Sequence, residues 1–363
     1  MKKIITDRNK ALQAVKQDGW NLEYVSPELQ NDKDVVIEAI KQDCYSLSFA
    51  SPELKNDKDI IMAAVKQKGY ALDYASPELR NDKEVVMAAI KQNIFALDYA
   101  SPELQNDKEV VMESIKINSE LFKNISPKLQ ADKDVVMGAV KQSGWNLEYA
   151  SPELQNDKEV VMEAVNNCNY SLYYASHYYC NALYYASPEL QNDKEVVMEA
   201  IKQEGNSLQF ASPELQNDKE VVMVAVKDNG RALQFASPEL QNDKEVVMVA
   251  VKQDGYALQF ASQKLQNDKD VVIETVKKNP YIIKYVSPEL QNDKEVVLVA
   301  IENETSAAEW MSDDLKKDKD FMKQAIKIDK NSVVYADKSI RDKMIDEILH
   351  KEQTNSKEIE LER

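Results

Sequence analysis

The sequence contains few of the residues on which most enzymes depend. Its 363 residues include 2 histidines, 3 cysteines and 7 glycines. A Ser-His-Asp triad needs a histidine together with a nucleophile on a sharp turn, and neither His177 nor His350 belongs to such a pattern. The glycine-rich phosphate loops Gly-x-x-x-x-Gly-Lys-Ser/Thr and Gly-x-Gly-x-x-Gly are also missing. We therefore expect a protein that is not an enzyme and needs no cofactor.

Basic clusters and long apolar segments are missing as well. The formal net charge is −17 and the pI is near 4.8. Binding to nucleic-acid phosphates needs a patch of Lys and Arg, so we expect no nucleic-acid partner. No apolar segment approaches the roughly 18 residues that span a bilayer, and residues 1–7 do not form a signal peptide. We expect no membrane partner.

The cysteines Cys44, Cys168 and Cys180 are odd in number and form no disulfide framework, which favours free thiols in a reducing compartment. Cys168, His177 and Cys180 fall within 13 residues, so a zinc site is one interpretation. Their spacing matches no common zinc site, and a fourth ligand is not apparent. Free buried thiols and a surface histidine are the alternative, and we predict no metal.

The dominant feature of the sequence is a motif with a period of about 25 residues. Ser-Pro-Glu-Leu, or a close variant, recurs every 25 residues from Ser26 to Ser151 and again from Ser187 to Ser312. An Asp-Lys pair follows each of these serines by six residues. Degenerate copies of the motif extend the repeat at both ends. We therefore expect about thirteen units that make one helical solenoid domain over residues 1–350.

Two segments depart from the repeat. The step from Ser151 to Ser187 is 36 residues, which marks an 11-residue insertion near residues 171–183. Residues 351–363 form a polar C-terminal tail. We expect this tail to be disordered or a frayed capping helix.

Each unit contains a long amphipathic helix. From Asp243 to Gln253, apolar residues stand at steps three, four, seven and eight after the aspartate, and these share one helix face. The aspartate is an N-cap, acidic residues follow in the first turn and lysine stands in the last turn. A repeated calcium ligand is the other interpretation of this aspartate, which the following Lys disfavours. A glycine such as Gly255 is expected to close the helix.

A shorter helix over residues 256–261 follows, and Ser-Pro then opens a brief α or 3₁₀ turn. One unit is too small to bury its own apolar stripe, so units must stack on one another. Strand-like alternation appears nowhere. The predicted fold class is all-α, an α-solenoid of about thirteen 25-residue units, each made of a long helix, a short helix and a Ser-Pro turn.

The motif Leu-x-(Tyr/Phe)-Ala-Ser-Pro-Glu-Leu-x-Asn-Asp-Lys-Glu-Val-Val resembles an uncharacterised family of tandem helical repeats. This family is a domain of unknown function that occurs in multiple copies in bacterial and protist proteins, including proteins of intracellular bacteria. The resemblance covers most of the chain; it implies helical repeats and no activity. The Glu-rich tail also resembles export signals of proteins injected by intracellular bacteria. The expected location is therefore the cytoplasm, or a host cell after export without a classical signal peptide.

Aromatic pairs on the short helix are the first candidates for partner binding. The second member is aromatic in nearly every unit, which predicts a core position. The first member is replaced in Glu120, Asn206, Arg231 and Ser306, which predicts partial exposure. The first members proposed to bind a partner are Trp20, Tyr45, Tyr70, Phe95, Trp145 and Tyr256. Packing at the edge of the core is the alternative interpretation.

The insertion supplies the second set of candidates, because it is rich in tyrosine. Its candidate residues are Tyr173, Tyr174, His177, Tyr178, Tyr179 and Tyr184. Exposed tyrosine offers a large contact area at a low entropic cost, whereas a neutral duplication is the alternative.

The resulting hypothesis is a non-enzymatic protein–protein interaction scaffold, with a secreted effector of an intracellular bacterium as its more specific form. A second hypothesis is an acidic nucleic-acid mimic that sequesters a basic protein. Salt distinguishes them, since a complex built on charge weakens steeply as ionic strength rises.

Overall fold

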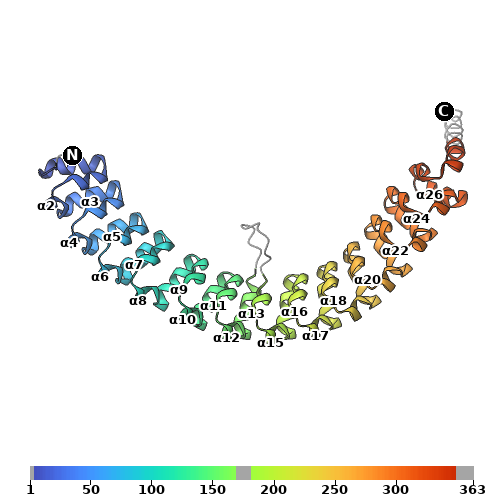
Figure 1. Ribbon diagram of the computed structural model, residues 1–363, viewed down its shortest axis with the longest axis horizontal. Coiled ribbons are helices and arrows are strands. Elements are labelled where there is room, and N and C mark those ends of the chain that lie inside the picture. The colour runs from blue at the N-terminus through green and yellow to red at the C-terminus, as the bar shows by residue number, and fades with distance from the viewer. Residues whose placement is uncertain (1–3, 169–180, 349–363) are drawn as a thin grey trace, which may run out of the picture. The chain divides into compact units, whose positions relative to one another are not determined.

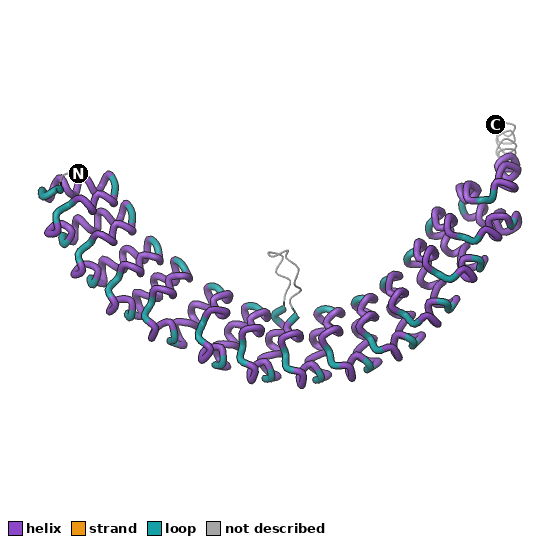
Figure 2. The backbone as a smooth tube through the Cα atoms, viewed as in Figure 1, coloured by secondary structure: helices purple, strands orange, loops and turns teal. Residues whose placement is uncertain are grey.

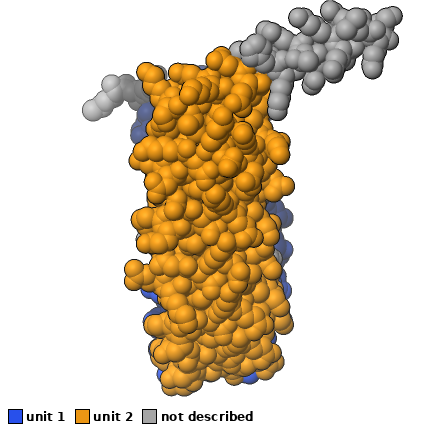
Figure 3. Space-filling model, turned by 90° about the vertical axis from the view of Figure 1, so that its right-hand side faces the viewer, with its two compact units in different colours: residues 1–187 blue, residues 188–363 orange. Residues whose placement is uncertain are grey.

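The computed structural model describes residues 4–168 and 181–348, and over these ranges the chain is helical without a named strand. One isolated parallel bridge pairs Ile5 with Val25. The chain divides into two compact units, residues 1–187 and 188–363. Figure 1 labels many of their helices. Figure 3 shows the two units in separate colours. The predicted fold class, repeating helices with a period of about 25 residues, is confirmed.

Over the described residues, the repeats follow the predicted order of long helix, short helix and turn, and most of these turns begin with Ser-Pro. In unit 1 the long helices are α1 (Arg8–Gln17), α3 (Lys33–Gln42), α5 (Lys58–Gln67), α7 (Lys83–Gln92), α9 (Lys108–Ile117), α11 (Lys133–Gln142) and α13 (Lys158–Asn166). In unit 2 they are α16 (Lys194–Gln203), α18 (Lys219–Asp228), α20 (Lys244–Gln253), α22 (Lys269–Lys278), α24 (Lys294–Asn303) and α26 (Lys319–Ile328).

A six-residue 3₁₀ helix follows nearly every long helix, where the sequence predicted a short helix. These are η1 (Gly19–Tyr24), η2 (Cys44–Phe49), η3 (Gly69–Tyr74), η4 (Ile94–Tyr99), η5 (Ser119–Asn124) and η6 (Gly144–Tyr149) in unit 1, where α14 (Ala182–Tyr185) takes the same place in the last repeat. In unit 2 they are η7 (Gly205–Phe210), η8 (Gly230–Phe235), η9 (Gly255–Phe260), η10 (Pro280–Tyr285), η11 (Thr305–Trp310) and η12 (Lys330–Tyr335).

A third, very short helix begins directly after the repeat serine, with Pro at its first position except after Ser262 and Ser312. In unit 1 these helices are α2 (Pro27–Gln30), α4 (Pro52–Lys55), α6 (Pro77–Arg80), α8 (Pro102–Gln105), α10 (Pro127–Gln130) and α12 (Pro152–Gln155). In unit 2 they are α15 (Pro188–Gln191), α17 (Pro213–Gln216), α19 (Pro238–Gln241), α21 (Gln263–Gln266), α23 (Pro288–Gln291) and α25 (Asp313–Lys317). Within each unit, successive helices of one kind follow one another in layers (Figure 2).

Local chemistry explains where each element begins. Asp57 caps α5, because its carboxylate accepts the backbone N–H groups of Asp59 and Ile60. Ser76 caps α6 by accepting the N–H of Leu79, and Pro77 occupies the first helical position, where no intrahelical N–H bond is needed. The repeated Asp-Lys and Ser-Pro pairs therefore fix the start of two helices in most layers.

The glycines have a different role from the one predicted. Gly69 was expected to close the long helix, but Lys68 ends α5 in an extended conformation and Gly69 begins η3. A Cβ atom on Gly69 would lie 2.4 Å from the carbonyl oxygen of Ala89, in the next long helix. The absence of a side chain therefore lets neighbouring layers approach closely.

The core runs between the layers. Ile60, Ile61, Ala64 and Val65 of α5 are fully buried, and so is Leu72 of η3. One repeat alone could not bury these apolar side chains, and the neighbouring repeats on both sides cover them.

The cysteines depart in part from the prediction of free thiols. Cys44 is free and buried in η2, and burial raises the pKa of its thiol. Cys168, directly after α13, is instead disulfide-bonded, and the prediction is wrong there. Cys168 lies where the chain leaves the repeat register, so the period gave no information about its neighbours. Over residues 4–168 and 181–348, no helix is both long and apolar enough to cross a membrane.

Candidate binding surface

Four positions, counted back from the repeat serine, describe the 3₁₀ layer. The first ring position lies six residues before the serine, the inner position five, the outer position three and the second ring position two. In the repeat before Ser76 these residues are Tyr70, Ala71, Asp73 and Tyr74. We call the first ring and outer positions together the ring surface.

The rings of unit 1 form a ladder between neighbouring repeats. Three first-position rings pack edge-to-face against the second-position ring of the next repeat. The centroids are 5.7 Å apart for Trp20 and Phe49, 6.3 Å for Tyr45 and Tyr74, and 6.0 Å for Tyr70 and Tyr99. Trp145 and Tyr185 continue the pattern at 6.0 Å, with a tilted geometry. The aromatic pairs found in the sequence thus make their ring contacts with the neighbouring layer.

The predicted first-position residues differ in exposure. Trp20, Phe95 and Tyr256 are 45%, 55% and 45% exposed. Tyr45, Tyr70 and Trp145 are half-buried. Each keeps part of its ring on the surface, as the varying residue type predicted, and the binding role of all six stays a prediction.

The tyrosine-rich segment is described only at its end. The candidates Tyr173, Tyr174, His177, Tyr178 and Tyr179 lie outside the described residues. Tyr184, at the outer position of α14, is 60% exposed. Its ring centroid lies 5.0 Å from that of Tyr185, whose pKa is raised to about 12 by burial and by the carboxylate of Glu148.

The outer position differs in chemistry between the two units. In unit 1 it is mainly acidic: Glu23, Ser48, Asp73, Asp98, Lys123 and Glu148, with Tyr184 in the last repeat. In unit 2 it is mainly uncharged: Gln209, Gln234, Gln259, Lys284, Glu309 and Val334. Sequence reasoning missed this row, which an alignment of the repeats on their serines could have found.

Unit 2 also carries different side chains at the first ring position. The Arg231 guanidinium lies 5.0 Å from the ring centroid of Tyr256 in the next repeat and 2.6 Å from the carboxylate of Asp254. Tyr281 accepts a hydrogen bond of 3.3 Å at its hydroxyl from Ser306 Oγ. The same slot therefore presents a cation, rings and hydroxyls in successive layers.

The framework beneath this surface hardly changes. Lys33 Nζ lies 2.8 Å from Asp57, the N-cap of the next long helix, and 3.5 Å from Asp59. This ammonium and two backbone N–H groups hold the pKa of Asp57 below its ordinary value, and the carboxylate raises the pKa of Lys33. The same ladder continues as Lys58–Asp82, Lys83–Asp107, Lys108–Asp132, Lys133–Asp157, Lys194–Asp218, Lys219–Asp243, Lys244–Asp268, Lys269–Asp293 and Lys294–Asp318.

Neighbouring layers are also joined by the repeat serine. The backbone N–H of Ser76 donates to the carbonyl oxygen of Lys55 at 3.0 Å, and its Oγ donates to Asn56 Oδ1 at 2.5 Å. The Asn and Lys of Asn-Asp-Lys were interpreted as local features of one helix start. Their partners in the adjacent layer could not be read from a single unit.

The junction at Ser126 in unit 1 lacks both of these serine bonds, whereas Ser151 lacks only the one from its Oγ. Among the described residues, the Ser126 N–H has no hydrogen-bond partner, and Ser126 Oγ is buried without one. The Asn106 amide, which would have accepted from that hydroxyl, donates to the carbonyl of Pro102 in its own helix at 2.8 Å. The bonds that join the layers elsewhere are therefore broken at Ser126.

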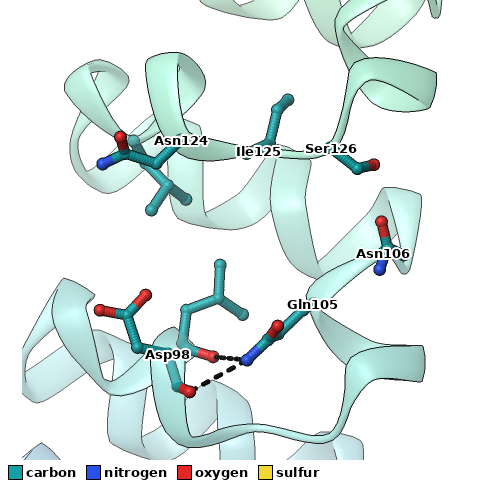
Figure 4. A pocket seen from close by; sticks show the side chains of 8 residues that line it. Asp98, Gln105, Asn106, Asn124, Ile125 and Ser126 are labelled. Atoms are coloured by element: carbon teal, nitrogen blue, oxygen red, sulfur yellow. Dashed lines mark hydrogen bonds between the residues drawn. The ribbon is translucent and has the colours of Figure 1, made fainter.

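A cavity of about 240 Å³ opens at this junction. Figure 4 shows it from close by, with Asp98 and Asn124 on the two layers that bound it. Asn124 occupies the second ring position, which carries an aromatic ring in every other described repeat from Tyr24 to Tyr335. The cavity is lined by Leu97, Asp98, Gln105, Asn106, Leu121, Asn124, Ile125 and Ser126.

The cause of the widened junction is the size of the inner residue. Leu121 stands where Ala, Ser or Asn stands in most repeats, and β-branched Ile125 replaces the usual alanine before the serine. A β-branched residue directly before the serine is not sufficient to break the bond between layers. Val25 stands at that place in the first repeat, and there the Ser26 N–H still donates to the carbonyl of Ile5. A bulky inner residue forces the layers apart in a close-packed stack.

The junction at Ser287 supports this explanation. Ile282 is its bulky inner residue and Val286 precedes the serine. In the described part of unit 2, the Ser287 N–H likewise lacks a bond to the preceding layer. Here the second ring position keeps its ring, but Tyr285 has moved outward and is 73% exposed.

Residues 4–168 and 181–348 contain no group of three or more His, Cys, Asp or Glu side chains placed to hold a metal ion. Comparisons with curated proteins and with solved structures gave no match. The family model described as Domain of unknown function (DUF4116) matches residues 7–55, 38–80, 57–105, 82–130, 132–179, 177–216, 218–266, 243–291, 268–311 and 293–341. Because these matches cover most of the chain, the protein belongs to this family of tandem repeats.

Proposed function

We propose that this chain is a non-enzymatic protein–protein interaction scaffold that binds partners through its ring surface. One observation carries the proposal: side chains at the ring surface change from layer to layer, whereas the contacts beneath them recur. The recurring part is the Asp cap, the Lys–Asp ladder and the buried Val-Val-Ala-Val stripe. A rigid frame with varied, partly exposed rings suits recognition, because aromatic side chains bury much area at low entropic cost.

The charge of each unit indicates the kind of partner. Acidic outer residues beside rings in unit 1 favour a partner segment that carries lysine or arginine among apolar residues. Unit 2 offers glutamines, Arg231 and Lys284 in the same rows, which suits a more polar or acidic segment. This proposal holds for either predicted location, the cytoplasm or a host cell after export.

Acidic mimicry of nucleic acid, the second hypothesis, has less support from the geometry. A mimic needs an unneutralised row of negative charges, but the capping aspartates of the ladder are paired with lysines of the preceding layer. If rings anchor the partner, raising the salt from about 0.1 to 0.5 M should weaken binding only a few-fold. A loss of several orders of magnitude would favour the mimic instead.

The experiment is affinity capture with two matched variants. The ring-stripped variant replaces Trp20, Tyr45, Phe95 and Trp145 with Ser, and the control replaces Lys66 and Lys91, exposed on long helices, with Ser. Circular dichroism and the melting temperature confirm that both variants fold. We expect the wild type and the control to retain the same partners, and the ring-stripped variant to lose them. Equal retention by all three proteins would refute the ring surface as the binding site.

A further inference from the structure

The ring ladder of unit 1 is interrupted at one layer. In the three junctions before it, the second-position ring packs against the first-position ring of the preceding repeat. At the fourth junction the first-position residue is Phe95, and the second-position residue is Asn124 in place of a ring. Phe95 is 55% exposed, which is more than Trp20 at 45% or the half-buried Tyr45 and Tyr70, all of which have ring partners. The row of second-position rings in unit 1 therefore lacks one member, in a layer whose first position carries Glu120 instead of a ring.

The missing ring coincides with the cavity at Ser126. Leu97, Leu121 and Ile125 make its apolar wall. The other repeats of the chain show which group fits beside such a wall, since Tyr or Phe stands at the equivalent place in each neighbouring layer. The cavity thus lies at the place where neighbouring layers carry an aromatic ring, and the bulk of Leu121 stands beside it.

Polar groups at the cavity indicate which side chain of a partner would lie next to an aromatic ring bound there. The Asp98 carboxylate lines it, and Glu120 is exposed on the 3₁₀ helix that carries Asn124. Among the described residues, the N–H and Oγ of Ser126 have no partner. An apolar pocket with a few unpaired polar groups is the usual form of a recognition site.

From the vacancy at Asn124 we infer that unit 1 takes up one aromatic side chain of a partner protein, next to a lysine or arginine of the same segment. The ring completes the ladder beside Phe95, between Leu97 and Leu121. The neighbouring cation pairs with Asp98. This inference rests on the proposed scaffold function and names the anchor residue of the partner.

The test uses the full chain and a defined probe, acetyl-Lys-(4-fluoro-Phe)-Lys-amide, followed by fluorine NMR. Acetyl-Lys-Ala-Lys-amide is the competitor that lacks a ring. A single side chain should bind weakly, with a Kd of roughly 1–10 mM. We expect a saturable shift of the fluorine signal with the wild type, and no displacement by the alanine peptide.

Two variants remove the cavity in different ways. Asn124→Tyr fills it with the ring of the other repeats, and Leu121→Ala with Ile125→Ala closes it by restoring small residues. The closing variant is needed because Tyr285 shows that a ring at a widened junction can also lie outside. The control Lys123→Tyr adds a ring at the adjacent outer position and leaves the cavity open. We expect both cavity variants to lose at least tenfold in probe affinity, and the control to keep it.

Equal binding of the probe by the wild type and both cavity variants would overturn the inference, and so would no binding by the wild type. If the wild type associates with itself and Asn124→Tyr abolishes that association, the occupant of the cavity is a second copy of this chain. That result would overturn the inference of a separate partner protein. The capture experiment separates the two proposals. If the ring-stripped variant loses its partners and both cavity variants keep them, the scaffold function stands and the vacancy is not the anchor site.

Discussion

The close approach of neighbouring layers at some glycines predicts whether a change from glycine to alanine raises or lowers the free energy of unfolding. Gly69 and Gly138 lie in the same unit, and each is changed to Ala. At Gly69 the new Cβ would lie 2.4 Å from Ala89 O, 3.0 Å from Asn93 Cβ and 3.1 Å from Asn93 N. The first distance is too short for any real contact, so the layers must shift. Overpacking of this kind costs about 1–3 kcal/mol.

The same substitution at Gly138 should have the opposite effect. Gly138 lies inside α11, and a Cβ there meets no atom within 4 Å. Glycine within a helix is less stable than alanine by about 0.5–1 kcal/mol, chiefly because the unfolded chain is more flexible. Gly138→Ala should therefore stabilise the protein. The chain itself carries Cys44 and Ile94 at places equivalent to Gly69, so a junction can be built wider, and Gly69→Ala should not unfold the protein.

The assay is hydrogen exchange of backbone amides in the full-length chain, since a repeat array can open layer by layer. Exchange in α5, η3 and α7 should accelerate for Gly69→Ala, by about tenfold for each 1.4 kcal/mol lost under fast-closing conditions. Exchange in α11 should slow for Gly138→Ala. Equal slowing in both variants would refute the close-approach explanation, because it would mean that only helix propensity matters at Gly69.

Three further predictions concern the junctions. Asp57→Ala should cost about 1–2 kcal/mol, because it removes both a helix cap and an ion-pair partner, whereas Lys33→Met should cost at most about 1 kcal/mol; urea unfolding compares them. The fold lowers the pKa of the Asp57 carboxyl below its ordinary 3.8. The stability that the ionised carboxylate adds to the folded state is therefore complete above pH 3.8 and is lost as the pH falls through the lower pKa of the folded state. A melting temperature that stays constant from about pH 5 to 2 would contradict this. Ala131→Asn should stabilise by about 0.5–1.5 kcal/mol, because it gives the unpaired Ser151 Oγ the acceptor found in other layers, and the gain should vanish when Ser151 is also changed to Ala.

The fold could be predicted almost entirely from the sequence, because the residues of each repeat determine its helices through local interactions. The spacing of Val246, Val247, Ala250 and Val251 defines one helix face, and Asp243 marks where the helix begins. The short helix was predicted in place and length, although its 3₁₀ geometry was left open. These features depend on residues close together in the chain, and the copies confirm one another.

Contacts between layers were less accessible, because they join residues about 20 to 26 positions apart that have separate local explanations. Lys33 looked like part of a helix start, and its bond to Asp57 needs the stacked geometry. The close packing of the next long helix against Gly69 is of the same kind. The vacancy at Asn124 carried a sequence signal, since its place holds a ring in the other described repeats, but the cavity also depends on the bulk of Leu121.

The most direct test of the binding surface is site-specific photo-crosslinking in cells. The photoreactive residue p-benzoyl-phenylalanine is placed at Trp20 or Tyr256 on the ring surface, and at Lys66 or Lys252 on the exposed face of the long helices. Irradiation followed by electrophoresis shows which positions lie against a partner. We predict discrete covalent adducts from Trp20 or Tyr256 and none from the two lysine positions. Adducts formed only from Lys66 or Lys252 would contradict the ring surface as the place where this protein binds.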